Sequence, residues 1–333
     1  MVTKQSTKKT KIKKKVVVIG GGTGTYTVLT GLKKYPIDLS AVVSMCDSGG
    51  STGRLRKELN ILPPGDVRRA IMALSDLPFA SKTLEEVFDF RFTSGKSLAG
   101  HSVGNILLAA LVQITGSMDR AIEETARIFN LSGSVYPVTL DKSNLVAILT
   151  DGTRIYGESK IDMRNIKLEH SIKKVYLTPE ARIFEKAARA IKEADLVVLC
   201  PGDLYTSIVP TLLVRGMNKA INESNAKLVY VVNLMTKRGE TDGFSAYDFL
   251  AVIRDYLGEA SEKISHVIVH RDKTKNNSKV ADWYKKYGST RVTNDLGKKK
   301  QSAKIITGDF MDITTFYRHD SDKLAKEIIS IFS

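Results

Sequence analysis

Four glycines within five positions follow a short β-branched run near the start of the chain, in the sequence VVVIGGGTGTY at residues 16–26. An apolar-periodic segment begins directly after them, so this stretch predicts a strand, a glycine turn and a helix. Glycine lets the backbone approach a ligand closely, and the first amides of a helix lack intrahelical partners. Such a helix start binds phosphate. The stretch therefore predicts a phosphate site for a nucleotide-like ligand at Gly21, Gly22, Thr23 and Gly24.

Three further polar or glycine-rich turns follow along the chain. A second strand, predicted over 40–45, leads to Asp47, near the place where a dinucleotide-binding unit carries the acid for a ribose hydroxyl. A strand over 195–200 leads to the loop PGDLYTS at 201–207, and GHSVGN at 100–105 opens an apolar run. Since ligands of open parallel sheets bind at the carboxyl ends of the strands, we interpret these turns as one composite site.

Two other interpretations of these turns remain open. The dinucleotide fingerprint G-x-G-x-x-G needs a third glycine, and threonine stands there in both registers (Thr25 or Thr27), which weakens an NAD assignment. Residues 49–53 match the nucleophile elbow G-x-S-x-G, in which Ser51 would attack a substrate with help from a later histidine and acid. We favour a loop that contacts phosphate or sugar, with Arg54 and Arg56 as cationic partners.

Several titratable residues near the turns suit either a structural or a functional role. Asp47 and Asp66 can bind magnesium or a ribose hydroxyl, and either can serve as a helix cap or turn residue. His101 can act as a general base or as a polar residue at a helix start. Arg68 and Arg69 begin a helix, where the dipole disfavours cations, so they suit a bound anion or a solvated face.

The net charge of +15 resides in two segments. Residues 1–15 contain seven lysines and no acid, and residues 271–304 contain eleven Lys or Arg and three Asp, so the remainder is neutral. We interpret residues 1–14 as a disordered basic tail and residues 271–304 as a polar, loop-like segment. No helix-turn-helix, zinc-finger or aromatic RNA-binding pattern accompanies the charge, which argues against specific nucleic-acid binding.

Apolar runs and cysteines restrict the class of protein. No apolar run approaches the roughly 20 residues of a membrane span. The basic start lacks the apolar stretch of a signal peptide, so we expect a cytoplasmic protein. Cys46 and Cys200 form neither a disulfide framework nor a zinc pattern, and we expect both to be small buried residues.

The alternation of strands and helices predicts an α/β fold with a Rossmann-like, doubly wound parallel sheet in three layers. Residues 15–333 are expected to form a single domain with an inserted helical and antiparallel β lobe. The helical part covers 61–133, and the β-rich insertion covers 134–178 with a hairpin turn at 151–152. A helix is expected over 179–193. The expected parallel strands cover 16–19, 40–45, 195–200, 227–233, 264–270 and 303–306.

Seven sequence blocks together resemble the bacterial gluconeogenesis factors of the CofD-like superfamily. They run from about residue 15 to residue 330 and read VVVIGGGTGTYTVLTGLK, CDSGGSTGRLRKEL, PPGDVRRAIMALSD, GHSVGNILLAAL, CPGDLYTSIVPTLLV, VVNLMTKRGETDGFS and YRHDSDKLA. The resemblance implies a cytoplasmic protein that binds nucleotide-activated sugars, notably UDP-N-acetylglucosamine, and links carbon metabolism to cell-envelope growth and cell shape. The superfamily's enzyme transfers a phospholactyl group from a guanosine-diphosphate donor to a deazaflavin coenzyme precursor.

Carried over by position, the resemblance implies that residues 21–24 bind the diphosphate and that Asp47 and the loop 49–54 lie near the sugar or base. It also implies that residues 201–207 close over the phosphates and that Arg318 reaches the ligand from the C-terminal segment.

The chain departs from the family pattern at three positions. Ser48 stands where a second aspartate is usual, which weakens a paired-carboxylate magnesium site. Asp203 replaces a usual serine and brings negative charge towards the phosphates, and Thr211 stands where asparagine is common.

We therefore expect a nucleotide or nucleotide-sugar ligand, first UDP-N-acetylglucosamine, with GDP and NAD as alternatives and a need for magnesium left open. The first hypothesis is a regulatory protein whose occupancy reports precursor supply to partner proteins. The alternative is a 2-phospho-L-lactate transferase-like enzyme with a nucleotide-diphosphate donor. The sequence assigns no catalytic residue or metal ligand and leaves a homo-oligomer open. The candidate ligand-binding residues are Gly21, Gly22, Thr23, Gly24, Asp47, Gly49, Gly50, Ser51, Arg54, Asp66, Asn105, Gly202, Asp203, Tyr205, Thr206, Ser207, Asn233 and Arg318.

Overall fold

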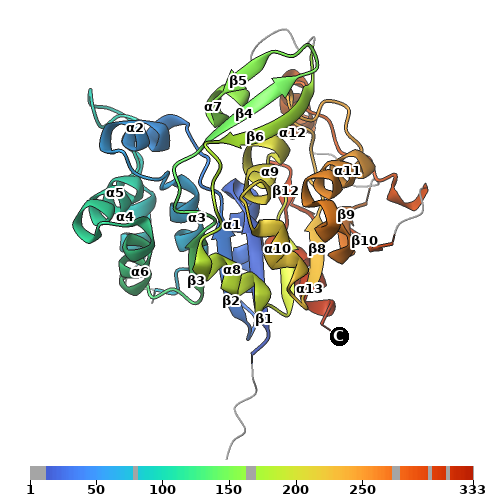
Figure 1. Ribbon diagram of the computed structural model, residues 1–333, viewed down its shortest axis with the longest axis horizontal. Helices are drawn as coiled ribbons and strands as arrows, with labels where there is room; N and C mark the ends of the chain where they lie inside the picture. Colours follow the sequence, from blue (N-terminus) through green and yellow to red (C-terminus); the bar gives the residue numbers. More distant parts are fainter. Residues whose placement is uncertain are drawn as a thin grey trace, which may run out of the picture.

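The computed structural model describes residues 13–77, 82–162, 170–271, 278–298, 302–312 and 316–332. A seven-stranded sheet in the order β10-β9-β8-β7-β1-β2-β3 forms its centre, and all neighbouring strands are parallel (Figure 1). Its strands are β1 (Lys15–Gly20), β2 (Asp38–Val43), β3 (Ser134–Pro137), β7 (Leu196–Leu199), β8 (Lys227–Val231), β9 (Ile264–His270) and β10 (Lys304–Gly308). The predicted parallel α/β sheet is confirmed.

The central strands are apolar because both of their faces are covered. In β1, Val16, Val17, Val18 and Ile19 are each at most 2% exposed. A continuous β-branched run of this kind is typical of an inner parallel strand, which has no polar face. Cys46 and Cys200 are buried just beyond β2 and β7, as expected, and burial raises the pKa of both thiols.

The chain reverses its direction of travel across the sheet between β1 and β7. It passes from β1 outward to β2 and β3, and then returns to β7 on the other side of β1. The loops that follow β1 and β7 therefore diverge and leave a crevice at the carboxyl edge, which is where open α/β sheets bind ligands.

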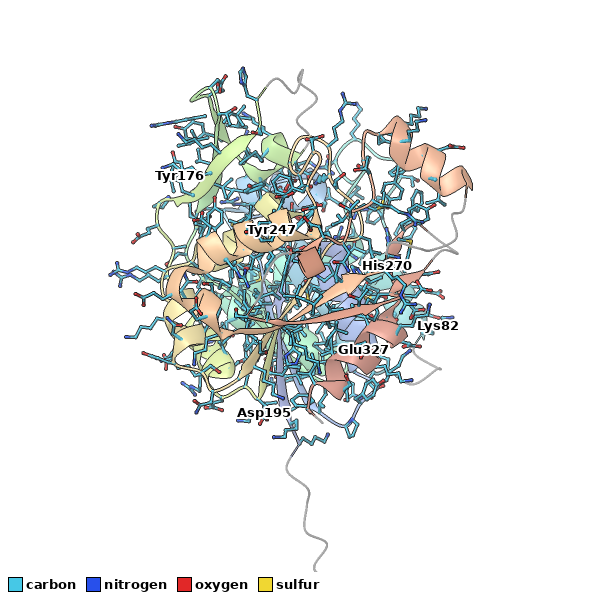
Figure 2. The ribbon with its side chains drawn as sticks, turned by 90° about the vertical axis from the view of Figure 1, so that its right-hand side faces the viewer. Lys82, Tyr176, Asp195, Tyr247, His270 and Glu327 are labelled. Atoms are coloured by element: carbon cyan, nitrogen blue, oxygen red, sulfur yellow. The ribbon has the colours of Figure 1, made fainter. Side chains whose placement is uncertain are left out.

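Helices cover both faces of the sheet, which gives the predicted three layers (Figures 1 and 2). On one face, α1 (Gly22–Leu32) packs against α3 (Gly65–Leu74) and α13 (Ser321–Ser330). On the other face lie α8 (Glu185–Lys192), α10 (Met217–Asn222) and α11 (Ala246–Leu257). A π-helix, η2 (Leu204–Ile208), and α9 (Val209–Leu212) connect β7 to α10. Two 3-10 helices precede strands: η3 (Gly258–Lys263) leads into β9, and η4 (Leu296–Lys298) precedes β10.

Two groups of elements are inserted between strands of the main sheet. A helical group between β2 and β3 comprises α2 (Gly50–Leu59), α3, α4 (Lys82–Asp89), α5 (Val103–Thr115) and α6 (Met118–Ile128). A small antiparallel sheet in the order β5-β4-β6 lies above the main sheet in Figure 1. It consists of β4 (Asn144–Leu149), β5 (Arg154–Tyr156) and β6 (Ile172–Thr178), with α7 (Glu158–Asp162) after β5. We call this sheet with α7 the lobe.

Three sequence expectations need correction. The β-rich insertion does not begin at 134, because Ser134–Pro137 pairs with β2 as the edge strand of the main sheet. The helix expected over 179–193 is shorter, Glu185–Lys192, and follows a cis Thr178–Pro179 peptide bond. The segment 271–304 is not all loop, because its aromatic residues at helical spacing form α12 (Ser278–Lys286).

Beyond these elements, a two-stranded ribbon of β11 (Met311–Asp312) and β12 (Arg318–His319) precedes α13. The expected basic tail, residues 1–14, lies outside the described residues except for its last two positions. Among the helices that the structure describes, none combines the length and the apolar character that crossing a bilayer would require.

Candidate functional site

The first glycine turn forms the floor of a cavity at the crevice between β1 and β7. Gly22, the first residue of α1, has φ of +66°, and Gly21 precedes the helix without a side-chain cap. A Cβ at Gly24 would lie 1.8 Å from the carbonyl oxygen of Pro201. Glycine at this position therefore allows the turn after β7 to approach the start of α1. The opening of α1 faces a cavity of about 290 Å³, as a phosphate-binding turn requires.

Acidic side chains surround this cavity, which we call the carboxylate cavity. Asp66 accepts a hydrogen bond of 2.9 Å from the Gly22 amide. Burial, and then the charge of Asp47, raise the pKa of Asp66 to about 6. The side chains and glycines that line the cavity are Gly21, Gly22, Thr23, Gly24, Asp47, Asp66, Arg69, Glu158, Asp162, Gly202, Asp203, Thr206 and Ser207.

The lobe contributes two of these acids through α7. Glu158 accepts a hydrogen bond of 3.0 Å from the backbone amide of Ser48, and the hydroxyls of Ser48 and Ser159 lie 3.2 Å apart. Burial, together with the nearby charge of Asp47, raises the pKa of Glu158 to about 7. Glu158 therefore brings a carboxylate from the lobe to the backbone of Ser48.

The turn after β7 is held by residues that follow β8. The Asn233 side chain donates to the carbonyl of Gly202 at 2.6 Å and accepts from its amide at 3.2 Å. Glu240, which is fully buried, accepts from the amide of Tyr205 at 3.0 Å and from the hydroxyl of Thr206 at 2.9 Å. These bonds fix the loop and the start of η2 beside the glycine turn.

One lysine joins the lobe, the turn after β7 and the loop after β8. Lys237 Nζ bonds to Asp162 and lies 2.7 Å from Asp203 and 3.2 Å from Glu240. The three carboxylates have oxygens within 4.8 Å of one another, a spacing that would suit a metal ion. The ammonium group of Lys237 contacts all three, so it occupies the place of a cation in this cluster.

A second, wider cavity adjoins the first along Thr23, Gly24, Gly202 and Asp203, and we call it the aromatic cavity. Its volume is about 550 Å³. Side chains of the loop after β8, of α12 and the turn after it, and of β12 and the residue before it form its walls. They include Asn233, Lys237, Arg238, Trp283, Tyr284, Tyr287, Tyr317 and Arg318.

The structure gathers most of the candidate residues and separates six from them. The candidates that line one of the two cavities are Gly21, Gly22, Thr23, Gly24, Asp47, Asp66, Gly202, Asp203, Thr206, Ser207, Asn233 and Arg318. The candidates that line neither cavity are Gly49, Gly50, Ser51, Arg54, Asn105 and Tyr205. Of the two helix-start arginines, Arg69 lines the carboxylate cavity, whereas Arg68 is buried and pairs with Asp89.

The potential nucleophile Ser51 does lie beside a histidine, but away from both cavities. Its hydroxyl is 2.9 Å from Nδ1 of His101 and accepts a bond of 3.1 Å from the Asn105 amide. All three side chains are at most 6% exposed, between α2 and the start of α5. Burial and the charge of Arg54 lower the pKa of His101, which favours the neutral ring. This cluster connects two helices of the insertion.

Several residues of the site were not among the candidates, and four of them, Glu158, Asp162, Lys237 and Trp283, are central to its geometry. The block VVNLMTKRGETDGFS carries a usable signal for Lys237, because it follows a predicted parallel strand at the carboxyl edge. Nothing in the local sequence places α7 over the glycine turn, since that contact depends on how the lobe packs.

The ionisation of Asp66 gives stability a pH dependence. Between its ordinary pKa of 3.8 and its raised value of about 6, the folded chain keeps a proton that the unfolded chain has released. Stability therefore falls as pH rises through this window and stays lower above it. We expect Asp66→Asn to match the wild type at about pH 4 and to exceed its unfolding free energy in urea by about 2 kcal/mol at about pH 8.

The control for this experiment is Asp151→Asn. Hydrogen bonds from Thr153 lower the pKa of Asp151, so this substitution should instead remove stability at neutral pH. Equal stabilities of wild type and Asp66→Asn at the higher pH would contradict the desolvated state of Asp66.

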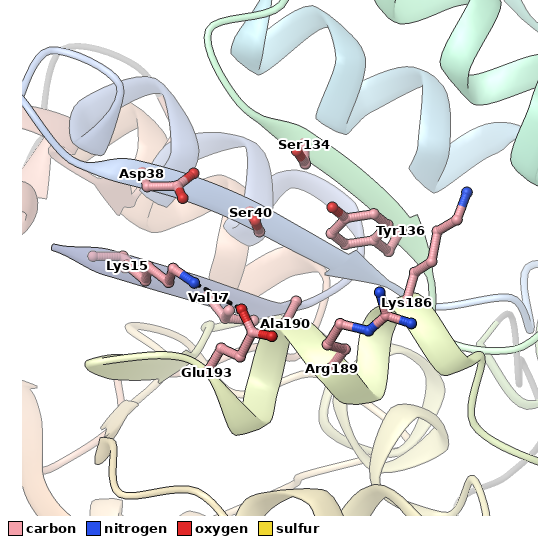
Figure 3. Close-up of a pocket in the computed structure, with 11 residues that line it drawn as sticks. Lys15, Val17, Asp38, Ser40, Ser134, Tyr136, Lys186, Arg189, Ala190 and Glu193 are labelled. Atoms are coloured by element: carbon pink, nitrogen blue, oxygen red, sulfur yellow. Dashed lines mark hydrogen bonds and ion pairs between the residues drawn. The ribbon is translucent and has the colours of Figure 1, made fainter. Parts of the chain in front are cut away.

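A further hollow of about 270 Å³ lies at the opposite, amino edge of the sheet, between β1, β2, β3 and α8 (Figure 3). Its cations are paired: Lys15 with Glu193 at 2.7 Å, and Lys186 with Asp119 and Glu123. Since these charges already have partners and ligands of such sheets bind at the carboxyl edge, the two cavities above are the better candidate site.

Comparisons with known proteins agree with this arrangement. The model of the family "2-phospho-L-lactate transferase CofD" matches residues 16–311. The gluconeogenesis factor of Halalkalibacterium halodurans is 40% identical over 320 residues, covering 95% of this chain and 96% of that protein. The gluconeogenesis factor of Bacillus subtilis is 36% identical over 324 residues, covering 96% of this chain and 98% of that protein.

A crystal structure of a Bacillus halodurans protein matches with a TM-score of 0.89 at 40% identity, covering 95% of this chain and 99% of that one. A second crystal structure, with a TM-score of 0.88 over 96% of this chain and 99% of that one, is described as a member of the UPF0052 family. The sheet order, the glycine turns and these matches over nearly the whole chain lead to one conclusion: the chain belongs to the gluconeogenesis factor family of the CofD-like superfamily.

Proposed function

We propose that this gluconeogenesis factor relative is a regulatory protein that binds a nucleotide-activated sugar, with UDP-N-acetylglucosamine as its preferred ligand. Occupancy of the site would report the supply of envelope precursors to partner proteins and so connect gluconeogenic carbon metabolism with envelope growth and cell shape.

The observation that carries this proposal is the opening of α1 at the junction of two cavities. Thr23 and Gly24 supply backbone amides at the positive end of the helix dipole, next to the Gly22 amide, which donates to Asp66. Space for one substituent lies on each side of them, in the carboxylate and the aromatic cavity. This arrangement suits a diphosphate that joins two bulky groups, as in a nucleotide sugar.

The side chains suit binding better than catalysis. Carboxylates such as Asp47 and Asp66 accept hydrogen bonds from sugar hydroxyls. Among the described residues that line the two cavities, none is a serine paired with a histidine, since the Ser51–His101 pair lies elsewhere. Recognition needs only donors for phosphate and acceptors for sugar, and the cavities have both.

A transferase that uses a nucleotide-diphosphate donor is the second candidate function. The observation in its favour is the paired carboxylates Asp47 and Asp66, which line one cavity and interact electrostatically. Carboxylate oxygens are hard donors that fit Mg²⁺, so these two residues would hold the ion, which would neutralise diphosphate charge. Arg69, in the same cavity, would contact the donor phosphates.

Calorimetric titration with UDP-N-acetylglucosamine, GDP and NAD, with and without magnesium, tests both functions. We expect micromolar binding of the UDP-sugar that does not need magnesium, with the ligand recovered intact. A preference for GDP with magnesium, together with product formation, would favour the transferase. Absence of binding by every nucleotide would overturn the assignment of the glycine turns.

Arg318→Ala tests the cationic side of the site in the same titration. Arg318 lies on β12, which contacts α1, and it lines the aromatic cavity with Thr23. We expect its loss to weaken UDP-sugar binding at least tenfold, since a charge-assisted hydrogen bond contributes about 1.5 to 3 kcal/mol. Arg127→Ala on the exposed face of α6 is the control and should bind normally.

A further inference from the structure

Two exposed aromatic side chains, one on α12 and one directly after it, form one wall of the aromatic cavity. Trp283 and Tyr287 are 41% and 51% exposed, and their ring centroids lie 4.4 Å apart with a tilt of 41°. Exposed aromatic rings that line a concave cavity, instead of filling a core, offer their faces to a planar ligand group.

Further rings behind this wall hold it in place. Tyr284 stacks on Tyr317 with centroids 5.5 Å apart and planes 2° from parallel, and the Arg291 guanidinium lies 4.8 Å from the Tyr317 centroid. Trp283 meets Tyr284 edge-on at 5.0 Å and Phe316 at 4.9 Å. A ring that is already ordered loses little entropy when a ligand stacks on it.

Charge is segregated along the cleft that the two cavities form. Among the described residues, the carboxylate cavity carries five acids and one arginine. In the aromatic cavity Arg238 and Arg318 add positive charge, Lys237 is already paired with carboxylates, and only Asp203 is shared with that acidic set. An anionic group is therefore more stable towards the aromatic side of the glycine turn, and a neutral group that donates hydrogen bonds is more stable on the carboxylate side.

We propose that the nucleobase stacks on the wall of Trp283 and Tyr287, that the diphosphate lies over the glycine turn, and that the sugar enters the carboxylate cavity. This inference rests on the proposed function and adds the orientation of the nucleotide sugar between the two cavities. About 550 Å³ accommodates a nucleoside. Any base can stack on tryptophan or tyrosine, because every base has a π-face. Asp47 then belongs to the sugar end of the site, not to the base end.

The chain contains a single tryptophan, so its fluorescence reports on this wall. We expect UDP and UDP-N-acetylglucosamine to change the emission of Trp283 with the same midpoint as in calorimetry. N-acetylglucosamine 1-phosphate has no base, and it should bind in calorimetry without changing the emission.

Leucine substitutions test the stacking directly. We expect Trp283→Leu and Tyr287→Leu each to weaken UDP-N-acetylglucosamine binding about tenfold, within the range for loss of one base–aromatic stack, and to leave binding of N-acetylglucosamine 1-phosphate unchanged. Tyr156→Leu is the matched control, because Tyr156 is 54% exposed but lies on β5, away from both cavities.

The outcomes separate the inference from the function on which it rests. Calorimetric binding of the UDP-sugar with unchanged emission, and with full affinity in Trp283→Leu, would overturn the base assignment and leave the proposed function standing. No heat from any nucleotide would overturn both.

Discussion

Replacing Gly24 with alanine is expected to abolish nucleotide binding at ligand concentrations that saturate the wild type. The added Cβ would lie 1.8 Å from the Pro201 carbonyl oxygen, a separation that no relaxation of a side chain can relieve. The turn after β7 must therefore move away from α1, which opens the phosphate site between the two cavities. We expect affinity for the UDP-sugar to fall roughly a hundredfold or more, equivalent to about 2.8 kcal/mol.

The same helix offers a matched control in Gly31→Ala. A Cβ there would lie 2.1 Å from the Ser321 carbonyl oxygen of α13, so both variants force backbone apart, but only Gly24 does so at the cavities. Each should lose about 3 kcal/mol of unfolding free energy. Circular dichroism gives the folded fraction and calorimetry the affinity of the folded molecules. If both variants bound the UDP-sugar equally well, the phosphate site would not lie at this contact.

The phosphate turn is predictable from the sequence because all of its parts are local. Val16 to Ile19 identify an inner strand, the glycines follow at once, and the periodic apolar residues of α1 come next. The parallel sheet follows from the same alternation repeated along the chain. Neither inference requires knowledge of which distant segments meet.

Helix orientation explains the candidates that line neither cavity. Ser51, Arg54 and Asn105 belong to glycine-rich blocks, and from sequence any of them can face a ligand. In the structure, Ser51 is turned into the contact between α2 and α5, and Arg54 donates to the carbonyl of Ala99. A glycine turn identifies where the backbone bends, but the packing of the following helix decides which side chains face the cavity.

The many lysines of residues 271–304 predict a loop, so a prediction from the sequence misses α12 and the aromatic side chains that line the aromatic cavity. Lysines dominate that segment, yet Val280, Trp283, Tyr284 and Tyr287 recur at spacings of three and four residues, as on one face of a helix. The lobe presents a different difficulty, because the position of Glu158 over the glycine turn depends on long-range packing. Local patterns therefore predict the phosphate site, whereas tertiary packing determines the carboxylate cavity and the aromatic cavity on either side of it.

Lys237→Met is expected to destabilise the protein and to make it sensitive to divalent cations. Without Nζ, the oxygens of Asp162, Asp203 and Glu240 lie within 4.8 Å of one another, and no lysine ammonium remains among them. Glu240 cannot turn to solvent, because it is fully buried and bonded to Tyr205 and Thr206. Because Asp162 and Asp203 are partly exposed and Glu240 is buried, removing the cation costs about 2 kcal/mol of unfolding free energy, less than for a fully buried ion pair.

Lys186→Met provides the comparison, since Lys186 also bridges two carboxylates, Asp119 and Glu123, but on the surface. Its removal should cost less than about 1 kcal/mol and create no cation dependence. Millimolar Mg²⁺ should restore part of the stability lost in Lys237→Met, because carboxylate oxygens at this spacing can bind a hard cation in place of the ammonium group. Urea unfolding with and without Mg²⁺ measures both effects.

The result also tests how the lobe is connected to the rest of the site. Asp162 belongs to α7, whereas Asp203 and Glu240 belong to the loops after β7 and β8, so Lys237 is the charge that joins the three segments. If Lys237→Met were as stable as the wild type and indifferent to Mg²⁺, Glu158 and the packing of β4 to β6 would suffice to hold the lobe. The expected loss of stability would instead show that Lys237 couples the lobe to the loops after β7 and β8. A ligand in the carboxylate cavity could then affect the lobe through Lys237.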